Sequence, residues 1–425
     1  MVTPLPGPLP LDPDGKGLGL FEPGCTTAQV AGLGWNLLAE DVSLPAAVLS
    51  EQRVAHNLRW MQQFMEAYRV KLAPHGKTTM SPSLFRRQID AGAWGITLAT
   101  APQTQAAYHH GVRRVLLANQ LVGRANMAII ARLLRDPDFS FYCLVDSPRN
   151  VAQLGAFFQS AGQTLPVLIE LGVAGGRNGV RDEAQLQAVL DELARWPGAL
   201  ALAGIEVYEG VLQNEADIRA FLQRATATLR TLAADGRLRQ DGPALISGAG
   251  SAWFDVVADE FAGLEIGQPL EIVLRPGCYL SHDVGIYRSA AERIAAHNPV
   301  AQRLAPGLLP ALQVWAYVQS VPEPGRAIVA LGKRDAAFDA GLPVPATVYR
   351  PGGEATAPQA APAHWKLTAM MDQHAFMEIA PGDDIAVGDM IAFDISHPCL
   401  TFDKWRQILL IDDSHTVTGI AETYF

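Results

Sequence analysis

Short apolar runs alternate with helical patterns from about residue 45 onward. Nine such runs read AAVLS, VKLAP, WGITLA, RRVLLA, SFYCLV, LPVLIEL, LAGIEVY, PALIS and LEIVLR. Between the first two runs, apolar residues recur every three or four positions, which predicts one apolar face of a helix: Val54, Leu58, Met61, Met65 and Tyr68. Strands that alternate with helices in this way predict an α/β protein with a parallel sheet.

The number of units indicates the kind of parallel sheet. About eight strand–helix units over roughly 230 residues are typical of a (β/α)8 TIM-like barrel. An open, doubly wound sheet is the alternative. Because the sequence holds nine runs and a barrel takes eight strands, we expect one run to lie outside the barrel or not to be a strand.

The pattern changes after about residue 280. Helical periodicity fades, and strand-like runs such as LQVWAYVQSV, DMIAFDI and RQILLI are separated by Gly, Pro and Asp. We therefore predict a barrel at residues 41–280 and a β-rich C-terminal domain at residues 281–425. Residues 1–40 begin with the Pro-rich MVTPLPGPLPLDPDG, which does not read as a signal peptide. We expect this N-terminal arm to pack on the β-rich domain or on a partner subunit.

Composition narrows the class of protein. Hydrophobic residues make up 49% of the chain, which argues against disorder. With 33 basic and 43 acidic residues, the net charge of −10 gives no basic footprint for nucleic acid. No apolar run approaches the roughly 18 residues of a membrane helix, so we expect no membrane partner. Cysteines without paired spacing favour a reducing cytoplasm over secretion: Cys25, Cys143, Cys278 and Cys399.

The first candidate for chemistry is APHGKTTMSP, residues 73–82. Lys77 follows a strand-like run and precedes a helix start, which in a barrel is the face that carries active sites. A lysine in a dry pocket there can form a Schiff base with an aldehyde. On this local context alone, a solvated loop lysine is the favoured interpretation. His75 could move protons or could merely hydrogen-bond the turn.

Two glycine-bearing segments follow late strands. Backbone N–H groups of ISGAGS, residues 246–251, could bind a phosphate, which barrels often hold after their last strands. The RPGCY turn at the end of the next strand could close the same cradle, and both segments could equally be ordinary turns. The candidate phosphate-binding residues are Ser247, Gly248, Gly250, Ser251, Gly277 and Tyr279.

Arg177 and Tyr208 are candidates for contact with a ring. Arg177 lies in the loop GGRNGV after the strand LPVLIEL, where it could pair with a ring nitrogen or a carboxylate. Tyr208 ends the strand IEVY and could lean on an aromatic ligand. An exposed loop arginine and a core tyrosine are the alternatives.

His397 and Cys399 are candidates for metal binding. They are two residues apart in SHPCLTFDKW, and in an extended segment this spacing puts both side chains on one face. Imidazole and thiolate together suit Zn²⁺. Without further information, a buried thiol beside a hydrogen-bonded histidine is the favoured interpretation. His374, in MMDQHAF, is a possible third neighbour.

These motifs together resemble one known family. APHGKTTMSP, the Arg177 loop, SGAGS, RPGCYLSHD, DQHAF and HPC…TFDKW occur in the order found in the D-serine dehydratase and D-threonine aldolase family, an alanine-racemase-like group of pyridoxal-phosphate enzymes. The likeness runs from about Asp41 to Tyr424. It implies a pyridoxal 5'-phosphate barrel followed by a β-domain, in a homodimer whose site lies near the interface.

The resemblance also assigns roles to residues. Lys77 would be the Schiff-base lysine, Arg177 and Tyr208 would lie near the cofactor ring, and the glycine segments would surround the phosphate. His397 and Cys399 would bind the metal. The aldolase branch has Asp in place of the cysteine, so Cys399 favours a zinc-dependent dehydratase of D-3-hydroxy amino acids. A metal-dependent D-threonine aldolase, a racemase and a cofactor carrier without turnover are the alternatives.

Overall fold

A parallel barrel forms the first structural unit. The computed structural model describes residues 7 and 9–425. Eight parallel strands follow the order β2-β9-β8-β7-β6-β5-β4-β3. A parallel bridge between His75 and Thr97 joins the two ends of this order, so the sheet closes on itself. The strands are β2 (Lys71–Leu72), β3 (Ile96–Leu98), β4 (Arg114–Gln120), β5 (Ser140–Val145), β6 (Leu165–Leu171), β7 (Leu200–Val207), β8 (Ala244–Gly248) and β9 (Leu270–Leu274).

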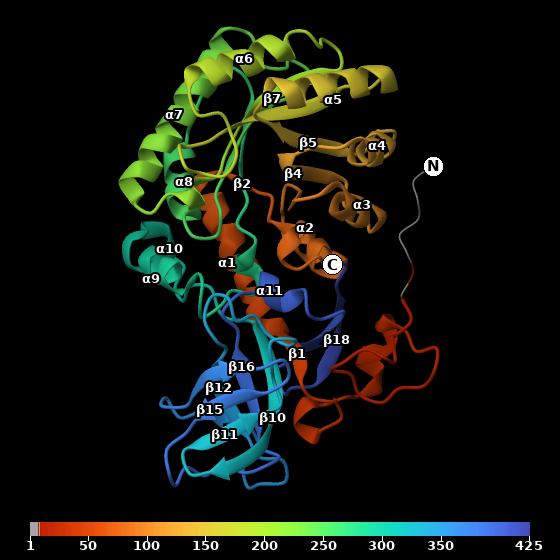
Figure 1. Cartoon of the computed structure of the whole chain (residues 1–425), viewed down its shortest axis with the longest axis vertical. Coiled ribbons are helices and arrows are strands. Elements are labelled where there is room, and N and C mark those ends of the chain that lie inside the picture. Colours follow the sequence, from red (N-terminus) through yellow and green to blue (C-terminus); the bar gives the residue numbers. More distant parts are fainter. Residues whose placement is uncertain (1–6, 8) are drawn as a thin grey trace.

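Helices cover the outside of this barrel (Figure 1). Several begin at a residue whose side chain accepts a backbone N–H: Ser147 caps α5 through Asn150, and Asp182 caps α6 through Gln185. The alternation of strand and helix confirms the predicted barrel. The helices are α1 (Glu51–Tyr68), α2 (Pro82–Asp90), α3 (Ala101–His109), α4 (Arg124–Leu133), α5 (Pro148–Ala161), α6 (Glu183–Leu193), α7 (Glu215–Ala234) and α8 (Phe254–Phe261).

A ten-stranded, mostly antiparallel sheet forms the second unit, beneath the barrel in Figure 1. Its first strand, β1 (Ala46–Ser50), pairs with β10 and β17, so AAVLS is the ninth run that lies outside the barrel. The other strands are β10 (Leu312–Glu323), β11 (Arg326–Val329), β12 (Val344–Tyr349), β13 (Gln359–Ala360), β14 (Lys366–Met370), β15 (Ala375–Glu378), β16 (Met390–Asp394), β17 (Gln407–Ile411) and β18 (Val417–Glu422).

Short helices connect the two units and carry site residues. α9 (Arg288–His297) and α10 (Pro299–Arg303) follow the last barrel strand. α11 (Cys399–Phe402) lies between β16 and β17 and faces the barrel (Figure 1). The single-turn η3 (Gly76–Thr78) follows β2, and η5 (Cys278–Leu280) follows β9. The first and last barrel strands therefore end next to the second unit.

The N-terminal arm lies on the second unit. Its η1 (Thr27–Leu33) packs beside β18, and η2 (Leu37–Ala39) follows it. Leu11, Val30 and Trp35 are buried in one apolar cluster with residues of that sheet. Residues 1–6 and 8, the start of the Pro-rich segment, lie outside the described residues.

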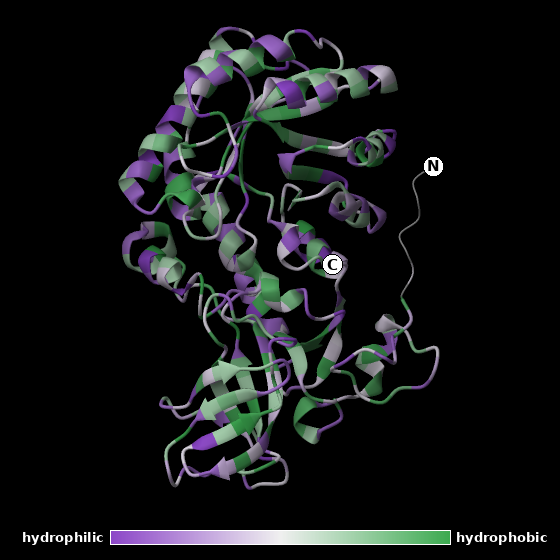
Figure 2. Cartoon of the chain, viewed as in Figure 1, coloured by the Kyte–Doolittle hydropathy of each residue, from purple (hydrophilic) through white to green (hydrophobic). Residues whose placement is uncertain are grey.

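Apolar residues concentrate on the strands. Figure 2 shows hydrophobic residues along the strands of both units, whereas the outer helices carry hydrophobic and polar residues. The largest buried cluster lies between the barrel strands and their helices, and a second fills the ten-stranded unit. In the described part of the chain, no helix is long and apolar enough to cross a membrane.

Candidate active site

Lys77 lies at the carboxyl end of the first barrel strand. It sits in η3, is exposed, and follows His75, which pairs with Thr97 of the neighbouring strand. Burial holds the pKa of His75 well below its ordinary value, and the charges of Lys77 and Arg275 lower it further. His75 is therefore neutral near pH 7. Its Nδ1 is buried without a partner in the described chain, which fits a polar ligand at this place.

Arg177 and Tyr208 lie together at the same face of the barrel. Arg177, in the loop after β6, stacks its guanidinium over the Tyr208 ring, with 4.7 Å between Cζ and the ring centroid. Burial raises the pKa of Tyr208, and the neighbouring Glu209 raises it further. The two predicted ring-binding residues are thus in contact and present a flat cationic and aromatic surface.

The sequence interpretation missed a buried charged group in the barrel wall. Arg275 makes an ion pair with Glu206 of β7. Glu170 of β6 is the register partner of Glu206, and burial together with the charge of Glu206 raises the pKa of Glu170 to about 7. The two carboxylates lie in the apolar runs LPVLIEL and LAGIEVY. A single Glu within each apolar run was the feature of the sequence that could have indicated a buried charge. One oxygen of Glu206 and Nε of Arg275 have no partner among the described residues.

The glycine segment after β8 is only partly available to a phosphate. The N–H groups of Ala249 and Gly250 donate to the buried Glu209 carboxylate, at 3.1 and 2.8 Å. The hydroxyl of Ser247 donates to the Val273 carbonyl within the barrel wall, so the structure gives Ser247 a role in the strands and not at a ligand. Gly248 ends β8 beside this segment.

The turn after β9 approaches the same place. The Ser251 hydroxyl accepts the N–H of Cys278 at 3.2 Å, so the two predicted phosphate segments meet. Tyr279 is buried, and its hydroxyl accepts a hydrogen bond from Gln88 at 3.2 Å. The Tyr279 hydroxyl therefore has a partner within the barrel. The N–H groups of Ser251 and Gly277 donate to no group in the described residues, and these donors fit an anion.

Gly277 permits close contact between this turn and the lysine segment. A Cβ on Gly277 would lie 2.6 Å from the carbonyl oxygen of His75 and 2.7 Å from Oγ1 of Thr78. We expect Gly277→Ala to push these segments apart, to cost about 1–3 kcal/mol, and to weaken cofactor binding. Thermal unfolding and cofactor titration measure both effects. Gly32→Ala is the control, because no atom lies within 4 Å of its Cβ; equal results for the two variants would contradict the prediction.

His397 and Cys399 lie at the start of α11, and the structure places Asp339 beside His397. Nδ1 of His397 is 2.8 Å from Oδ2 of Asp339, which leaves Nε2 for other contacts. Hydrogen bonds from Cys278 and His397 lower the pKa of Cys399 to about 4, although burial opposes this. The hydrogen bond to Cys399 raises the pKa of His397 to about 9. These shifts favour a thiolate at Cys399 and a protonated imidazole at His397, and the imidazole could bind a metal after it loses its proton.

The second unit brings this pair to the lysine segment. Thr78, next to Lys77, has its Oγ1 3.6 Å from Sγ of Cys399. His374 is exposed at the turn between β14 and β15, and Figure 1 shows β15 well away from α11. The structure thus joins the predicted lysine and metal segments and leaves His374 apart. Within residues 7 and 9–425, no three His, Cys, Asp or Glu side chains form a ready metal cluster.

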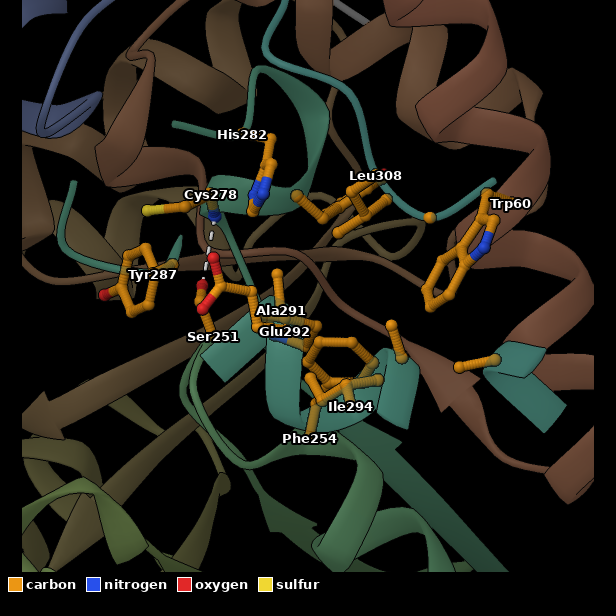
Figure 3. Close-up of a pocket in the computed structure, with 15 residues that line it drawn as sticks. Trp60, Ser251, Phe254, Cys278, His282, Tyr287, Ala291, Glu292, Ile294 and Leu308 are labelled. Carbon is orange, nitrogen blue, oxygen red and sulfur yellow. Dashed lines mark hydrogen bonds between the residues drawn. The ribbon is translucent and has the colours of Figure 1, made fainter. Parts of the chain in front are cut away.

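A largely apolar cavity opens beside these residues. It has a volume of about 240 Å³ and lies between the barrel and α9. Figure 3 shows the side chains of Trp60, Phe254, Ile294 and Leu308 around one end, and Ser251 with Cys278 at the other. The cavity therefore connects the glycine segments to an apolar space large enough for a small molecule.

The fold and the site define a class of protein. A parallel barrel carries a lysine at its carboxyl face, and a second β-rich unit brings a histidine and a thiol beside it. Two family profiles match the chain: the alanine racemase N-terminal domain over residues 49–267 and the putative serine dehydratase domain over residues 311–411. The chain belongs to the alanine racemase N-terminal domain family.

Individual relatives agree with the resemblance seen in the motifs and confirm it. The chain is 27% identical to a D-threonine aldolase from an Arthrobacter species, over 88% of this chain and 90% of the relative. It is 30% identical to a D-threo-3-hydroxyaspartate dehydratase from Delftia sp. strain HT23, over 39% of this chain and 43% of the relative. By their names, both relatives are lyases that act on D-amino acids.

Solved structures confirm the fold. The crystal structure of D-threonine aldolase from Filomicrobium marinum is 25% identical with a TM-score of 0.73, and covers 92% of this chain and 97% of that chain. An alanine racemase-like protein from Idiomarina loihiensis is 14% identical with a TM-score of 0.67, and covers 90% of this chain and 97% of that chain. The barrel and the β-rich second unit are therefore the fold of this group.

Proposed function

We propose that this protein is a pyridoxal 5'-phosphate- and zinc-dependent dehydratase of D-3-hydroxy amino acids. Its substrates would be molecules such as D-serine, D-threonine or D-threo-3-hydroxyaspartate, and its products a 2-oxo acid and ammonia. This makes it a carbon–oxygen lyase of the D-serine ammonia-lyase type. The observation that carries the proposal is the meeting of the Lys77 segment with Cys399 through Thr78 at 3.6 Å.

The residues at the barrel mouth fit the cofactor. When bound, pyridoxal phosphate supplies an electron sink for the α-carbon. Lys77 would hold its aldehyde carbon, and Arg177 with Tyr208 would lie beside its ring. The free N–H groups of Ser251 and Gly277 would bind its phosphate, and Gly248 and Gly250 would lie beside it in the same segment. The buried polar atoms left without partners, on His75, Glu206 and Arg275, fit a polar molecule among them.

The residues of the second unit fit zinc. Thiolate and imidazole are donors that zinc prefers, and the Asp339 carboxylate orients His397 as such partners do in zinc sites. When bound there, zinc acts as a Lewis acid on a hydroxyl group. A solved structure of a relative, a dehydratase variant with one cysteine replaced by alanine, is described as the metal-free form, which supports a metal in this group.

Proton transfer falls to the lysine and its neighbours. Lys77 is exposed at the mouth of the barrel, so its amine can reach a substrate and take the α-proton once it is free. His75 is neutral and half-buried two residues away, where it can accept or donate one hydrogen bond and so orient groups near Lys77. The apolar wall of Trp60, Phe254 and Leu308 would keep bulk water from one side of the cavity.

A metal-dependent D-threonine aldolase is the second candidate. The relative that covers 88% of this chain is named as such an enzyme, whereas the named dehydratase covers 39%. Against it, the aldolase branch carries Asp where this chain has Cys399. A thiolate is a softer and stronger donor to zinc than a carboxylate, so the metal at this site would differ from that of the aldolases.

The products formed from D-threonine test the proposal. The purified protein, supplied with pyridoxal phosphate and zinc, is expected to release 2-oxobutanoate and ammonia in equal amounts. L-Threonine is the control and should remain unchanged. Glycine with acetaldehyde would identify an aldolase instead, and bound cofactor without either set of products would identify a carrier.

We also propose that the protein is a homodimer with the active site near the interface. Light scattering of the cofactor-loaded protein is expected to give about twice the chain mass of 45.7 kDa. The support is the resemblance, from about Asp41 to Tyr424, to a family of homodimers. A mass of one chain together with full activity would refute the homodimer.

A further inference from the structure

The thiol of Cys278 lies beside the pair His397 and Cys399. Its Sγ is 3.8 Å from Sγ of Cys399. The two cysteines come from different units, since Cys278 begins η5 after the last barrel strand and Cys399 begins α11. Oγ1 of Thr78 is within 4.0 Å of both sulfur atoms, so the group adjoins the lysine segment. Two thiols from different units therefore meet where the barrel and the second unit join, and His397 lies two residues from one of them.

The distance between the sulfurs matches one edge of a zinc site. Sulfur ligands bind zinc at about 2.3 Å, and two of them on one tetrahedral ion lie about 3.8 Å apart. His397 stands two residues before Cys399, and its Nδ1 is 2.8 Å from Oδ2 of Asp339. The imidazole therefore has one nitrogen fixed by a carboxylate and the other free for a metal, as in known zinc sites.

A buried oxygen without a partner adjoins the same group. The Asp283 side chain is 1% exposed. Its Oδ1 accepts the N–H groups of Gly285 and Tyr287, but Oδ2 has no partner in the described chain. The charges of His397 and Cys399 both act on this carboxyl group. A metal-bound water would give Oδ2 the donor that it lacks, so this oxygen is a second sign of a ligand here.

We propose that Cys278 is a third protein ligand of the metal, which makes the site a Cys2His zinc centre with one position open. This inference rests on the proposed function for the metal pair, and deepens it. Catalytic zinc sites have three protein ligands and an open fourth position, which two ligands alone would not provide. Because the Cys399 sulfur is 3.8 Å from that of Cys278, and His397 is two residues away along the chain, a metal bound to Cys399 would recruit both other side chains. Two thiolates also favour zinc over manganese.

Cobalt substitution without substrate tests this ligand set. Wild-type protein with reduced cysteines and bound Co²⁺ is expected to show a near-ultraviolet charge-transfer band from thiolate to cobalt. The absorbance of this band should correspond to two thiolate ligands for each cobalt ion. Cys278→Ser should halve that band and weaken zinc binding at least about tenfold. Loss of a residue that only hydrogen-bonds to a metal ligand already has an effect of about this size. Cys25→Ser is the control and should match wild type, since Cys25 lies in the N-terminal arm.

Alkylation of the wild-type protein gives an independent measurement if the variant fails to fold. With zinc bound, Cys278 and Cys399 should both resist iodoacetamide, and both should react after chelation. A one-thiolate band in the wild type, equal zinc affinity in folded Cys278→Ser, or no cobalt binding would overturn the proposal. A two-thiolate band in a protein without lyase activity would keep Cys278 as a ligand and reject the proposed function alone.

Discussion

Lys77→Ala is expected to lower the turnover of D-3-hydroxy amino acids at least about 1000-fold, because it would remove both the proposed attachment point of the cofactor and the proposed base for the α-proton. The position of the lysine supports this size of effect. Lys77 follows the first barrel strand at its carboxyl end, and its neighbour Thr78 contacts Cys399 of the second unit. Steady-state release of the 2-oxo acid measures the loss.

Borohydride reduction identifies the attachment point directly. In the wild type, reduction should fix the cofactor on the peptide that contains Lys77, and Lys77→Ala should give no such labelled peptide. Lys366→Ala is the control, because Lys366 is exposed on β14 and pairs only with Glu378 at the surface. Labelling of another lysine in the wild type would show that the assignment is wrong.

Cys399→Ala is expected to lower elimination at least about 100-fold while the cofactor stays bound. The reason is that, in the proposed function, the metal would act on the leaving hydroxyl group, whereas the barrel would hold the cofactor. Chelation of the wild type should have the same effect, and added zinc should restore the activity of the wild type but not of the variant. Zinc content measures the loss of metal, cofactor absorbance measures the retained cofactor, and 2-oxo acid release measures elimination.

The chain offers a matched control for this cysteine. Cys25 is also a free, half-buried cysteine, but it lies in the N-terminal arm. Cys25→Ala should keep zinc and activity. A chelated, zinc-free protein that turns over D-serine at the normal rate would remove the metal from the mechanism and leave His397 and Cys399 as a packed pair.

The barrel could be predicted because its signal is local. Apolar runs alternate with helical periodicity, and helix starts such as Ser147-Pro148 stand between them. The number of runs also indicated that one strand lay elsewhere. Which one could not be read from the sequence, since AAVLS looks like the other runs. Only the pairing of β1 with β10 and β17, more than 260 residues away, places it in the second sheet.

The chemistry of the site was only partly visible in the sequence. Lys77, His397 and Cys399 stand in recognisable motifs, but the buried carboxylates Glu170 and Glu206 stand in strands that read as plain apolar runs. Those glutamates matter because the barrel turns them inward together. The charges of Glu170 and Glu206 then act on each other in the buried interior of the barrel. The spacing of residues along the chain does not reveal this interaction.

The sequence by itself determined the kind of elements, their order and the residue types that could do chemistry. Periodicity is set by neighbouring residues, so one chain carries that information without any fold. The tertiary structure decided which distant groups meet: it brings Cys278 to 3.8 Å from Cys399, and it gives the N–H groups of Ala249 and Gly250 to Glu209. Such contacts depend on how distant segments pack against one another, within the barrel and between the two units. Packing and burial over the whole molecule determine that arrangement.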